Sequence, residues 1–203
     1  MAALTRTTEL EAVNTILRMM GEAPINSLES GFGLGEQAEA ALLDASRKIQ
    51  MENWSFNTDY SLTLTFDSNG YIYIPSTALR VEVNPFDYPD FEVIQRGNRL
   101  YEKRSNTYVF TQNLIADVTH GLPWEELPEH ARHYITAKAG RDLQMQVIGS
   151  KDLNEVNYGI EIEARAAFLD LETTLSNHSL LQGNPSVMGN YFSYVPANAL
   201  RRK

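Results

Sequence analysis

Two histidines and two glutamates lie close together in this sequence, and side chains of these types can bind a metal ion. His130 and His133 follow Glu126 and flank no glutamate, since Glu129 precedes both of them. A zinc-binding helix places two histidines four residues apart with a glutamate between them, so that both imidazoles face one ion. In this chain the spacing is three and the order differs. The helix dipole already explains carboxylates at a helix start, so we expect no metal site and no cofactor.

Paired carboxylates are the second chemistry that the residue types suggest. A glycosidase needs two carboxylates ~5–10 Å apart across a cleft, and the acidic–aromatic segment at residues 87–91 is a candidate for facing a sugar. No catalytic spacing supports that interpretation over an ordinary loop between strands, and no G-x-S-x-G anchors a Ser-His-Asp site. We predict no catalytic residues. The acidic and aromatic residues that could face a sugar or form a carboxylate pair are Asp87, Tyr88, Asp90, Phe91, Glu92, Glu161 and Glu163.

A glycine-rich segment at residues 31–35 precedes a predicted helix, and phosphates bind at helix N-termini. No strand precedes this segment, its third glycine is misplaced and no Lys-Ser/Thr pair follows, so the phosphate-loop pattern is incomplete. We interpret it as a plain loop.

The composition excludes several classes of protein. The 203 residues carry a formal net charge of −9 and no cysteine, so disulfides and thiolate chemistry are impossible. The acidity argues against a protein that binds nucleic acid phosphates tightly. A surface lining a DNA conduit would be acidic too, because repulsion prevents sticking, but acidity that merely keeps the protein soluble explains the charge equally well. The N-terminus has no apolar segment typical of a signal peptide. No apolar run approaches the ~20 residues of a membrane span.

The first half of the chain begins with two predicted helices. Thr8 and Glu11 form a capping box, Gly21 is expected as a left-handed C-cap, and Pro24 blocks continuation. A second helix is predicted over residues 35–53. The apolar positions fall at helical spacing, at Leu10, Val13, Leu17 and Met20 in the first helix and at Ala38, Ala41, Leu42, Ala45 and Ile49 in the second.

Residues 60–118 alternate with period two between turn residues, and β-branched and aromatic side chains dominate them. Closely spaced strands with tight turns indicate an antiparallel sheet. The predicted strands cover residues 61–66, 71–75, 79–83, 91–96, 99–104, 107–110 and 114–118.

The helical period returns from Glu125, and an antiparallel helix pair is expected with its connection at Gly149 and Ser150. The third helix should bury Ala131, Tyr134, Ile135, Ala139 and Leu143. The fourth, predicted over residues 151–175, should bury a stripe at Leu153, Val156, Ile160, Ala164, Ala167, Phe168, Leu171 and Leu175.

These elements predict an α+β protein. We expect an antiparallel helical bundle from residues 1–57 and 120–176, an inserted antiparallel β-sheet domain at residues 58–119, and an extended C-terminal arm at residues 177–203. The arm has no Asp, Glu, Lys or Arg between Asn177 and Leu200, yet it is rich in apolar and aromatic residues. Such a segment is unlike a disordered tail, and we predict that it binds a partner surface through Leu180, Leu181, Tyr191, Phe192, Tyr194, Arg201, Arg202 and Lys203.

Several motifs of the chain, in their order, resemble the tail tubular protein A family, the head-to-tail adaptors of short-tailed bacteriophages. The match is scattered to about Gly149, and Gln146 departs from it by standing where a basic residue is expected. The motifs are Ala12-Val13-Asn14-x-Ile16-Leu17 with Gly21-Glu22-x-Pro24-Ile25, then Trp54-Ser55-Phe56-Asn57, Arg96-Gly97-x-x-Leu100-Tyr101, and Glu126-Leu127-Pro128 with Ala131, Arg132, Tyr134 and Arg141.

The resemblance implies a structural adaptor of the virion tail that is assembled in the host cytoplasm. Such an adaptor forms a homo-oligomeric ring, a dodecamer, between the portal protein and a tail nozzle that resembles tail tubular protein B. DNA passes through the ring without specific binding, and no membrane is involved. By the same resemblance the arm meets the portal. The alternative that stays open is a tail-associated hydrolase that degrades polysaccharide or peptidoglycan.

Overall fold

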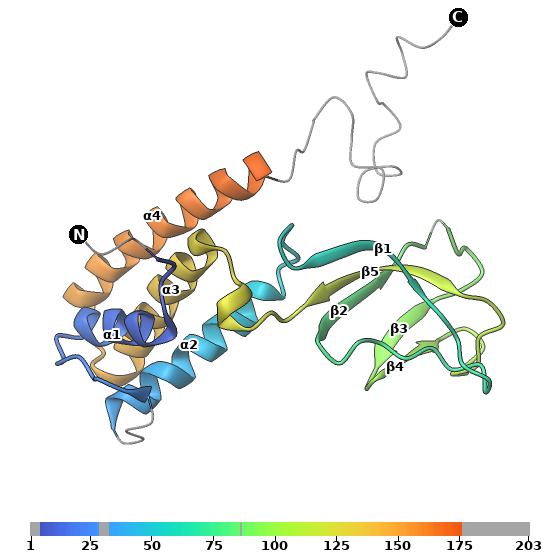
Figure 1. Ribbon diagram of the computed structural model, residues 1–203, viewed down its shortest axis with the longest axis horizontal. Helices are drawn as coiled ribbons and strands as arrows, with labels where there is room; N and C mark the ends of the chain where they lie inside the picture. Colours follow the sequence, from blue (N-terminus) through green and yellow to red (C-terminus); the bar gives the residue numbers. More distant parts are fainter. Residues whose placement is uncertain (1–4, 29–32, 86, 176–203) are drawn as a thin grey trace, which may run out of the picture. The chain divides into compact units, whose positions relative to one another are not determined.

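A computed structural model describes residues 5–28, 33–85 and 87–175, and these residues form two compact units (Figure 1). The helical unit comprises the described residues up to Glu52 together with Leu122–Glu172, and Asn53–Gly121 belong to the β unit. The helical unit holds α1 (Glu9–Met19), α2 (Leu34–Gln50), the 3-10 helix η2 (Trp124–Glu126), α3 (Glu129–Val147) and α4 (Lys151–Leu175). The β unit holds β1 (Thr58–Leu64), β2 (Ala78–Val83), β3 (Val93–Arg96), β4 (Arg99–Glu102) and β5 (Leu114–His120). The predicted α+β class is confirmed.

The start and end of α1 follow the predicted signals. The Thr8 backbone N–H donates to Glu11 Oε2 at 2.8 Å, and the Glu11 N–H donates to Thr8 Oγ1 at 3.3 Å, which completes the capping box. The backbone N–H and the hydroxyl of Thr8 both donate to Glu11 Oε2, and these two hydrogen bonds lower the pKa of Glu11. At the other end, Gly21 has a φ of +81°, and its N–H donates to the Arg18 carbonyl at 3.0 Å. A left-handed glycine therefore ends the helix.

Asn14 fixes the direction in which the chain leaves that turn. Its Nδ2 donates to the Ile25 carbonyl at 3.0 Å, and its Oδ1 accepts from the Ile25 N–H at 2.7 Å. One side chain thus satisfies both backbone groups of an irregular segment, which would otherwise be costly to bury. The side chain of Ile25 in turn packs against Gly35 at the start of α2.

α1, α2 and α3 contact one another and form the centre of the helical unit. The predicted buried stripe of α3 is confirmed, because Ala131, Tyr134, Ile135, Ala139 and Leu143 are all buried. α2 also buries its predicted stripe, except that Ala41 is half-buried. At Gly140 the backbone of α3 approaches α1 so closely that an added Cβ would lie 2.5 Å from Met19 Sδ.

The predicted start of the third helix at Glu125 is wrong by one turn. The chain instead forms η2 (Trp124–Glu126), passes through extended backbone at Leu127 and Pro128, and begins α3 at Glu129. Proline disfavours the helical conformation in the residue before it, so Pro128 separates the two helices.

Arg132 ties the N-terminal segment to the start of α3. Its side chain is only 4% exposed, and its guanidinium donates to three backbone carbonyls, those of Leu127 at 2.9 Å, Thr7 at 2.7 Å and Glu125 at 2.8 Å. Trp124 Nε1 also donates to the Thr7 carbonyl, at 3.0 Å. One buried cation therefore supplies hydrogen-bond donors to three carbonyls that lie before the start of α3.

We expect Arg132→Met to lower the free energy of unfolding by about 2–4 kcal/mol, because it keeps the aliphatic stem but removes charged donors from one buried and two partly buried carbonyls. Arg18→Met is the matched control, since Arg18 is exposed and donates to Thr15 Oγ1 on its own helix. Denaturant unfolding measures both. Equal, small losses for the two variants would show that the Arg132 hydrogen bonds do not hold the N-terminal segment.

The β unit is built on a three-stranded antiparallel sheet in the order β1-β5-β2 and a β3-β4 hairpin. Leu62 of β1 pairs with Ala116 of β5, and Val81 of β2 pairs with Val118 of β5. Leu64, Ile72, Leu100, Phe110, Leu114, Ala116 and Val118 form its core.

Two predicted strands are wrong. Residues 71–75 and 107–110 make only isolated bridges, because the first three residues of the first segment each pair with a different part of the chain. Tyr71 pairs with Val109, Ile72 with Phe66 and Tyr73 with Arg99. A continuous ladder requires successive pairs along one partner strand, and this segment has three partners.

Arginines lie over tyrosine rings on the β3-β4 hairpin. The Arg96 Cζ lies 3.8 Å from the Tyr101 ring centroid, and the Arg99 Cζ lies 4.9 Å and 4.8 Å from those of Tyr71 and Tyr108. Tyr101 and Tyr108 meet edge to face with centroids 4.8 Å apart. These cation–π contacts add to the few ladder bonds of this short hairpin.

Glu102 is a buried carboxylate that closes the turn after β4. Burial raises its pKa, but N–H groups of Ser105, Glu92 and Arg104 donate to it and outweigh burial, so that the pKa of Glu102 falls from 4.5 to about 2. Backbone hydrogen bonds favour the charged form of a carboxylate in this way.

We expect the resulting stabilisation to be complete above pH ~4.5 and to be lost as the pH falls toward about 2, because the unfolded chain binds the proton first. Glu102→Gln should lower the melting temperature near neutral pH, and its difference from the unchanged protein should shrink between pH ~4.5 and ~2. Thermal melts at stepped pH measure this. A difference that stays constant across the range would contradict the assignment.

Candidate subunit interface on the helical unit

The side of α4 that faces α3 is largely polar. The buried residues of α4 are Asn157, Glu161, Ala164, Phe168 and Glu172. They recur at intervals of four, three, four and four, which is the period of one helix face. Of the seven residues of the predicted stripe whose side chains the structure describes, only Ala164 and Phe168 belong to this buried face, so the predicted burial of that stripe is wrong for its exposed members.

Charged partners on α3 explain why a polar face is buried. Arg141 Nη1 lies 2.7 Å from Glu161 Oε2, and Lys138 Nζ lies 3.7 Å from Glu161 Oε1. Arg141 also donates through Nε to Asn154 Oδ1 at 3.0 Å. The hydrogen bond to Glu161 raises the pKa of Arg141. Ion pairs of this kind contribute little net stability, and here they join the polar face of α4 to α3.

An aromatic cluster anchors the other end of α4. The Phe168 ring stacks on Tyr134 with centroids 5.4 Å apart, and the His130 ring lies 5.4 Å away. His130 Nε2 lies 3.1 Å from Glu172 Oε1. Arg165 donates to the Tyr134 hydroxyl. His130 therefore serves the packing of α4 on α3, while His133 is exposed.

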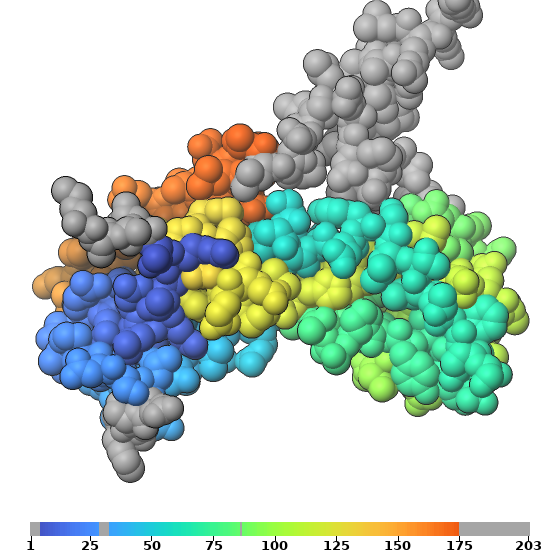
Figure 2. All heavy atoms as spheres, in the orientation of Figure 1, coloured from blue at the N-terminus to red at the C-terminus, as the bar shows by residue number. Residues whose placement is uncertain are grey.

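α4 leaves most of its apolar side chains exposed. Leu153, Val156, Ile160 and Leu171 are 38%, 62%, 40% and 44% exposed, and Ala167 between them is exposed as well. At 100° per residue these five fall within about 60° of one another and about 90° from the buried face. We call Leu153, Val156, Ile160, Ala167 and Leu171 the apolar ridge. α4, orange in Figure 2, lies along an edge of the helical unit.

The ridge is the reverse of an ordinary amphipathic surface helix, which buries its apolar residues and exposes its polar ones. Burying a leucine or isoleucine stabilises the fold by about 1.5–3 kcal/mol. In α4 several leucines and isoleucines are exposed and do not contribute this stabilisation, while two glutamates are buried. Contiguous apolar patches of more than a few hundred Å² mark interaction sites on soluble proteins. The ridge is therefore a candidate interface.

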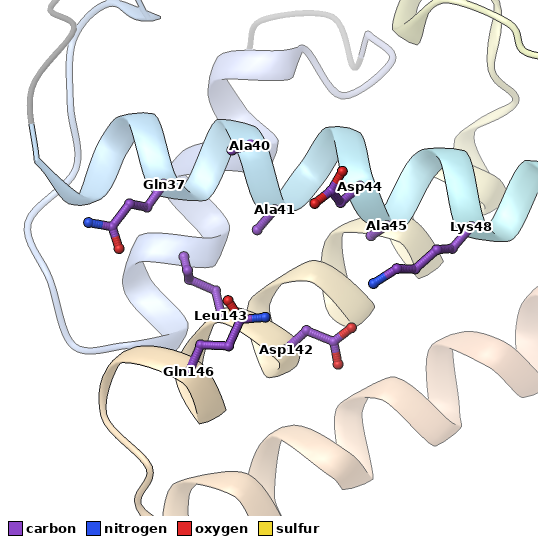
Figure 3. Close-up of a pocket in the computed structure, with 9 residues that line it drawn as sticks. All are labelled: Gln37, Ala40, Ala41, Asp44, Ala45, Lys48, Asp142, Leu143 and Gln146. Carbon is purple, nitrogen blue, oxygen red and sulfur yellow. The ribbon is translucent and has the colours of Figure 1, made fainter.

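A groove between α2 and α3 is a second candidate surface on the same unit (Figure 3). Ala40, Ala41 and Ala45 form much of its α2 wall, and Leu143 contributes from α3. Lys48, Asp44 and Asp142 supply charges. Gln37 and Gln146 complete the lining, so the position where a basic residue is expected from the family resemblance faces this groove.

Several of the candidate catalytic residues have packing or ion-pair partners within their own unit. Tyr88 and Phe91 pack on the core of the β unit, and the Tyr88 hydroxyl accepts from the Ile115 N–H at 2.9 Å. Glu92 pairs with Lys103, and Glu161 pairs with Arg141. Among the described residues no cluster of three His, Asp or Glu has the placement of a metal site. Gly33 lies at the N-cap of α2 with φ +84°.

Two other sequence predictions concern residues that lie outside the described part of the chain. Gly31 and Phe32 of the glycine-rich loop fall outside it, and so do all the partner-binding residues predicted for the arm, from Leu180 to Lys203. Within the described helices, none combines the length and apolarity of a membrane span. The sequence analysis predicted neither the ridge nor the groove as an exposed surface. The regular apolar spacing of α4 was the signal that could have identified the ridge.

Comparison with known proteins places these features in a family. The chain is similar to the tail tubular protein A of Klebsiella phage KP34, with 26% identity over 157 residues that cover 76% of this chain and 81% of the relative. A family model described as tail tubular protein matches residues 10–178, which include every helix and strand from Leu10 to the end of α4. The chain therefore belongs to the tail tubular protein family.

Proposed function

We propose that this tail tubular protein is the head-to-tail adaptor of a phage tail, a ring between the portal protein and the tail nozzle. The observation that carries the proposal is the family match over residues 10–178, which covers both structural units. A structural role in the tail follows from that membership. The position between portal and nozzle is the finer step, supported by the similarity to a tail tubular protein A.

The exposed ridge supports the oligomeric part of the proposal. A lone subunit leaves Leu153, Val156, Ile160 and Leu171 in water, whereas identical subunits that pack side by side bury such residues repeatedly. A ring uses head-to-tail contacts that close on themselves. The copy number of twelve comes from the family resemblance alone.

The charge of the chain supports passage of DNA without binding. Each chain has a net charge of −9, so a ring of many copies is strongly negative. This charge repels the DNA phosphates, so that DNA does not adhere to the ring as it passes through. The proposed partners are accordingly the portal, the nozzle and further copies of the chain. The proposed location is the virion tail, after assembly in the host cytoplasm.

Negative-stain imaging of the purified chain mixed with portal protein tests this function. We expect rings seated on one end of the portal. A chain that stays monomeric, ignores the portal and instead degrades peptidoglycan or capsular polysaccharide would overturn the adaptor and favour a tail-associated hydrolase.

A further inference from the structure

We propose that the apolar ridge of one subunit packs into the α2–α3 groove of the next copy of this chain, and that this contact builds the ring. The inference rests on the proposed function and specifies the surfaces through which it is carried out. Both surfaces lie on the helical unit, so each subunit carries one of each.

The shapes of the two surfaces suit each other. The ridge is a row of medium-sized apolar side chains spaced by three, four, seven and four residues along α4. The α2 wall of the groove offers Ala40, Ala41 and Ala45, whose short side chains let another helix approach closely. Helices pack by placing the side-chain row of one into the furrow of the other. Leu143 gives the groove an apolar floor.

The charges around the two surfaces are also complementary. Two carboxylates in the groove already have partners, since Asp44 lies 3.2 Å from Arg47 Nη1 and Asp142 lies 2.8 Å from Lys138 Nζ. Lys48 has no ion-pair partner within the described part of the chain. Its amine extends toward the groove in Figure 3.

The matching charge lies beside the ridge. Glu163 is exposed, comes three residues after Ile160 and four before Ala167, and no cation in the described ranges pairs with it. A ridge seated in a groove would bring this carboxylate to the groove's rim, where Lys48 supplies a positive charge. The complementarity favours a second copy of this chain as the occupant.

The contact is heterologous, because the ridge and the groove are different surfaces. A heterologous contact repeats from subunit to subunit and closes into a ring when the rotation allows it. A ridge-to-ridge contact would instead stop at a symmetric dimer. The proposed contact is therefore of the kind that the adaptor ring requires.

Single substitutions on each surface test the contact in the full-length chain. Val156→Glu places a charge at a ridge position that is 62% exposed, and Ala40→Trp fills the groove from an exposed site on α2. Ile162→Glu is the matched control, since Ile162 is 50% exposed and lies on the other flank of α4. Circular dichroism verifies that each variant folds.

We expect both surface variants to weaken assembly by at least about tenfold, because an unpaired charge or a filled groove opposes packing, while the control assembles normally. Mass photometry across a concentration series measures this. Glu163→Lys and Lys48→Glu should each weaken the ring, and the two together should restore it. Normal assembly by Val156→Glu and Ala40→Trp, or failure of the paired charge reversal to restore rings, would overturn the contact.

Two further results separate this inference from the proposed function. If the unchanged chain forms rings on the portal but the ridge and groove variants do so equally well, the adaptor stands and the assigned contact is wrong. If the unchanged chain forms no ring at any concentration, with or without portal, the ring itself is refuted. Symmetric dimers, or loss of rings on deletion of residues 177–203, would show that a second ridge or the arm occupies the surface and would contradict the proposal.

Discussion

Replacing Phe168 by alanine is expected to lower the free energy of unfolding by about 3–5 kcal/mol, the cost of removing a phenyl ring from a packed site. Phe168 is fully buried and stacks on Tyr134 beside His130. The only other buried apolar residue of α4 up to Thr174 is Ala164. Because the remaining buried positions are polar, the phenyl ring of Phe168 is the principal apolar anchor of α4. Few other apolar contacts can compensate for the cavity that its removal leaves.

Urea unfolding under conditions where the chain is monomeric measures this loss. Ile162→Ala, on an exposed flank of the same helix, is the matched control and should change stability by no more than about 0.5 kcal/mol. A loss below about 1 kcal/mol for Phe168→Ala would mean that α4 does not depend on the aromatic cluster. The ion pairs of Glu161 would then be its main attachment.

Deleting residues 177–203 is expected to abolish docking onto the portal while the melting temperature stays nearly unchanged. The reason lies in the sequence of the arm, whose aromatic residues Tyr191, Phe192 and Tyr194 each contribute about 1.5–3 kcal/mol when buried. An uncharged segment without periodicity cannot bury them against itself. Arg201, Arg202 and Lys203 add three adjacent positive charges for acidic groups on the partner.

Portal binding by the truncated and full-length chains, compared by sedimentation, measures the effect. A variant that keeps the arm but replaces the three aromatic residues with serine separates loss of anchoring from loss of chain length. If the truncated chain docks normally, the arm is not the anchor. If it fails to fold, the arm belongs to the core and the proposed division at residue 177 is wrong.

Local signals in the sequence predict the helices of this fold well. The capping box at Thr8 and the left-handed Gly21 are both confirmed, because capping depends on residues within one or two turns. The buried stripe of α3 is confirmed for a similar reason. α3 packs against both α1 and α2, so its apolar face has no alternative to burial.

The orientation of α4 could not be predicted in this way. Its apolar spacing indicates a stripe but does not say whether the stripe is buried in the subunit or in an assembly. The actual buried face depends on Arg141 and Lys138 of α3, which pair with Glu161 about twenty residues away. Pairing between helices is a tertiary contact, and the hydrophobic pattern does not report it.

Long-range contacts likewise escape sequence reasoning in the β unit. Alternation in residues 71–75 predicts a strand, but its three partners are set by how distant segments meet. The lowered pKa of Glu102 depends on backbone N–H groups of Glu92, Arg104 and Ser105 that converge only after folding. Asn14 is an intermediate case, since its place in a motif was evident but its bonds to Ile25 were not.

The most direct test of the central claim asks whether this chain joins the two parts of the particle. Portal and nozzle proteins are mixed with and without the chain, and the portal is recovered by sedimentation. We predict that the nozzle sediments with the portal only when the chain is present, and that the chain is found in the same complex. Recovery of nozzle with portal in its absence, or of both without the chain in the complex, would contradict the adaptor function.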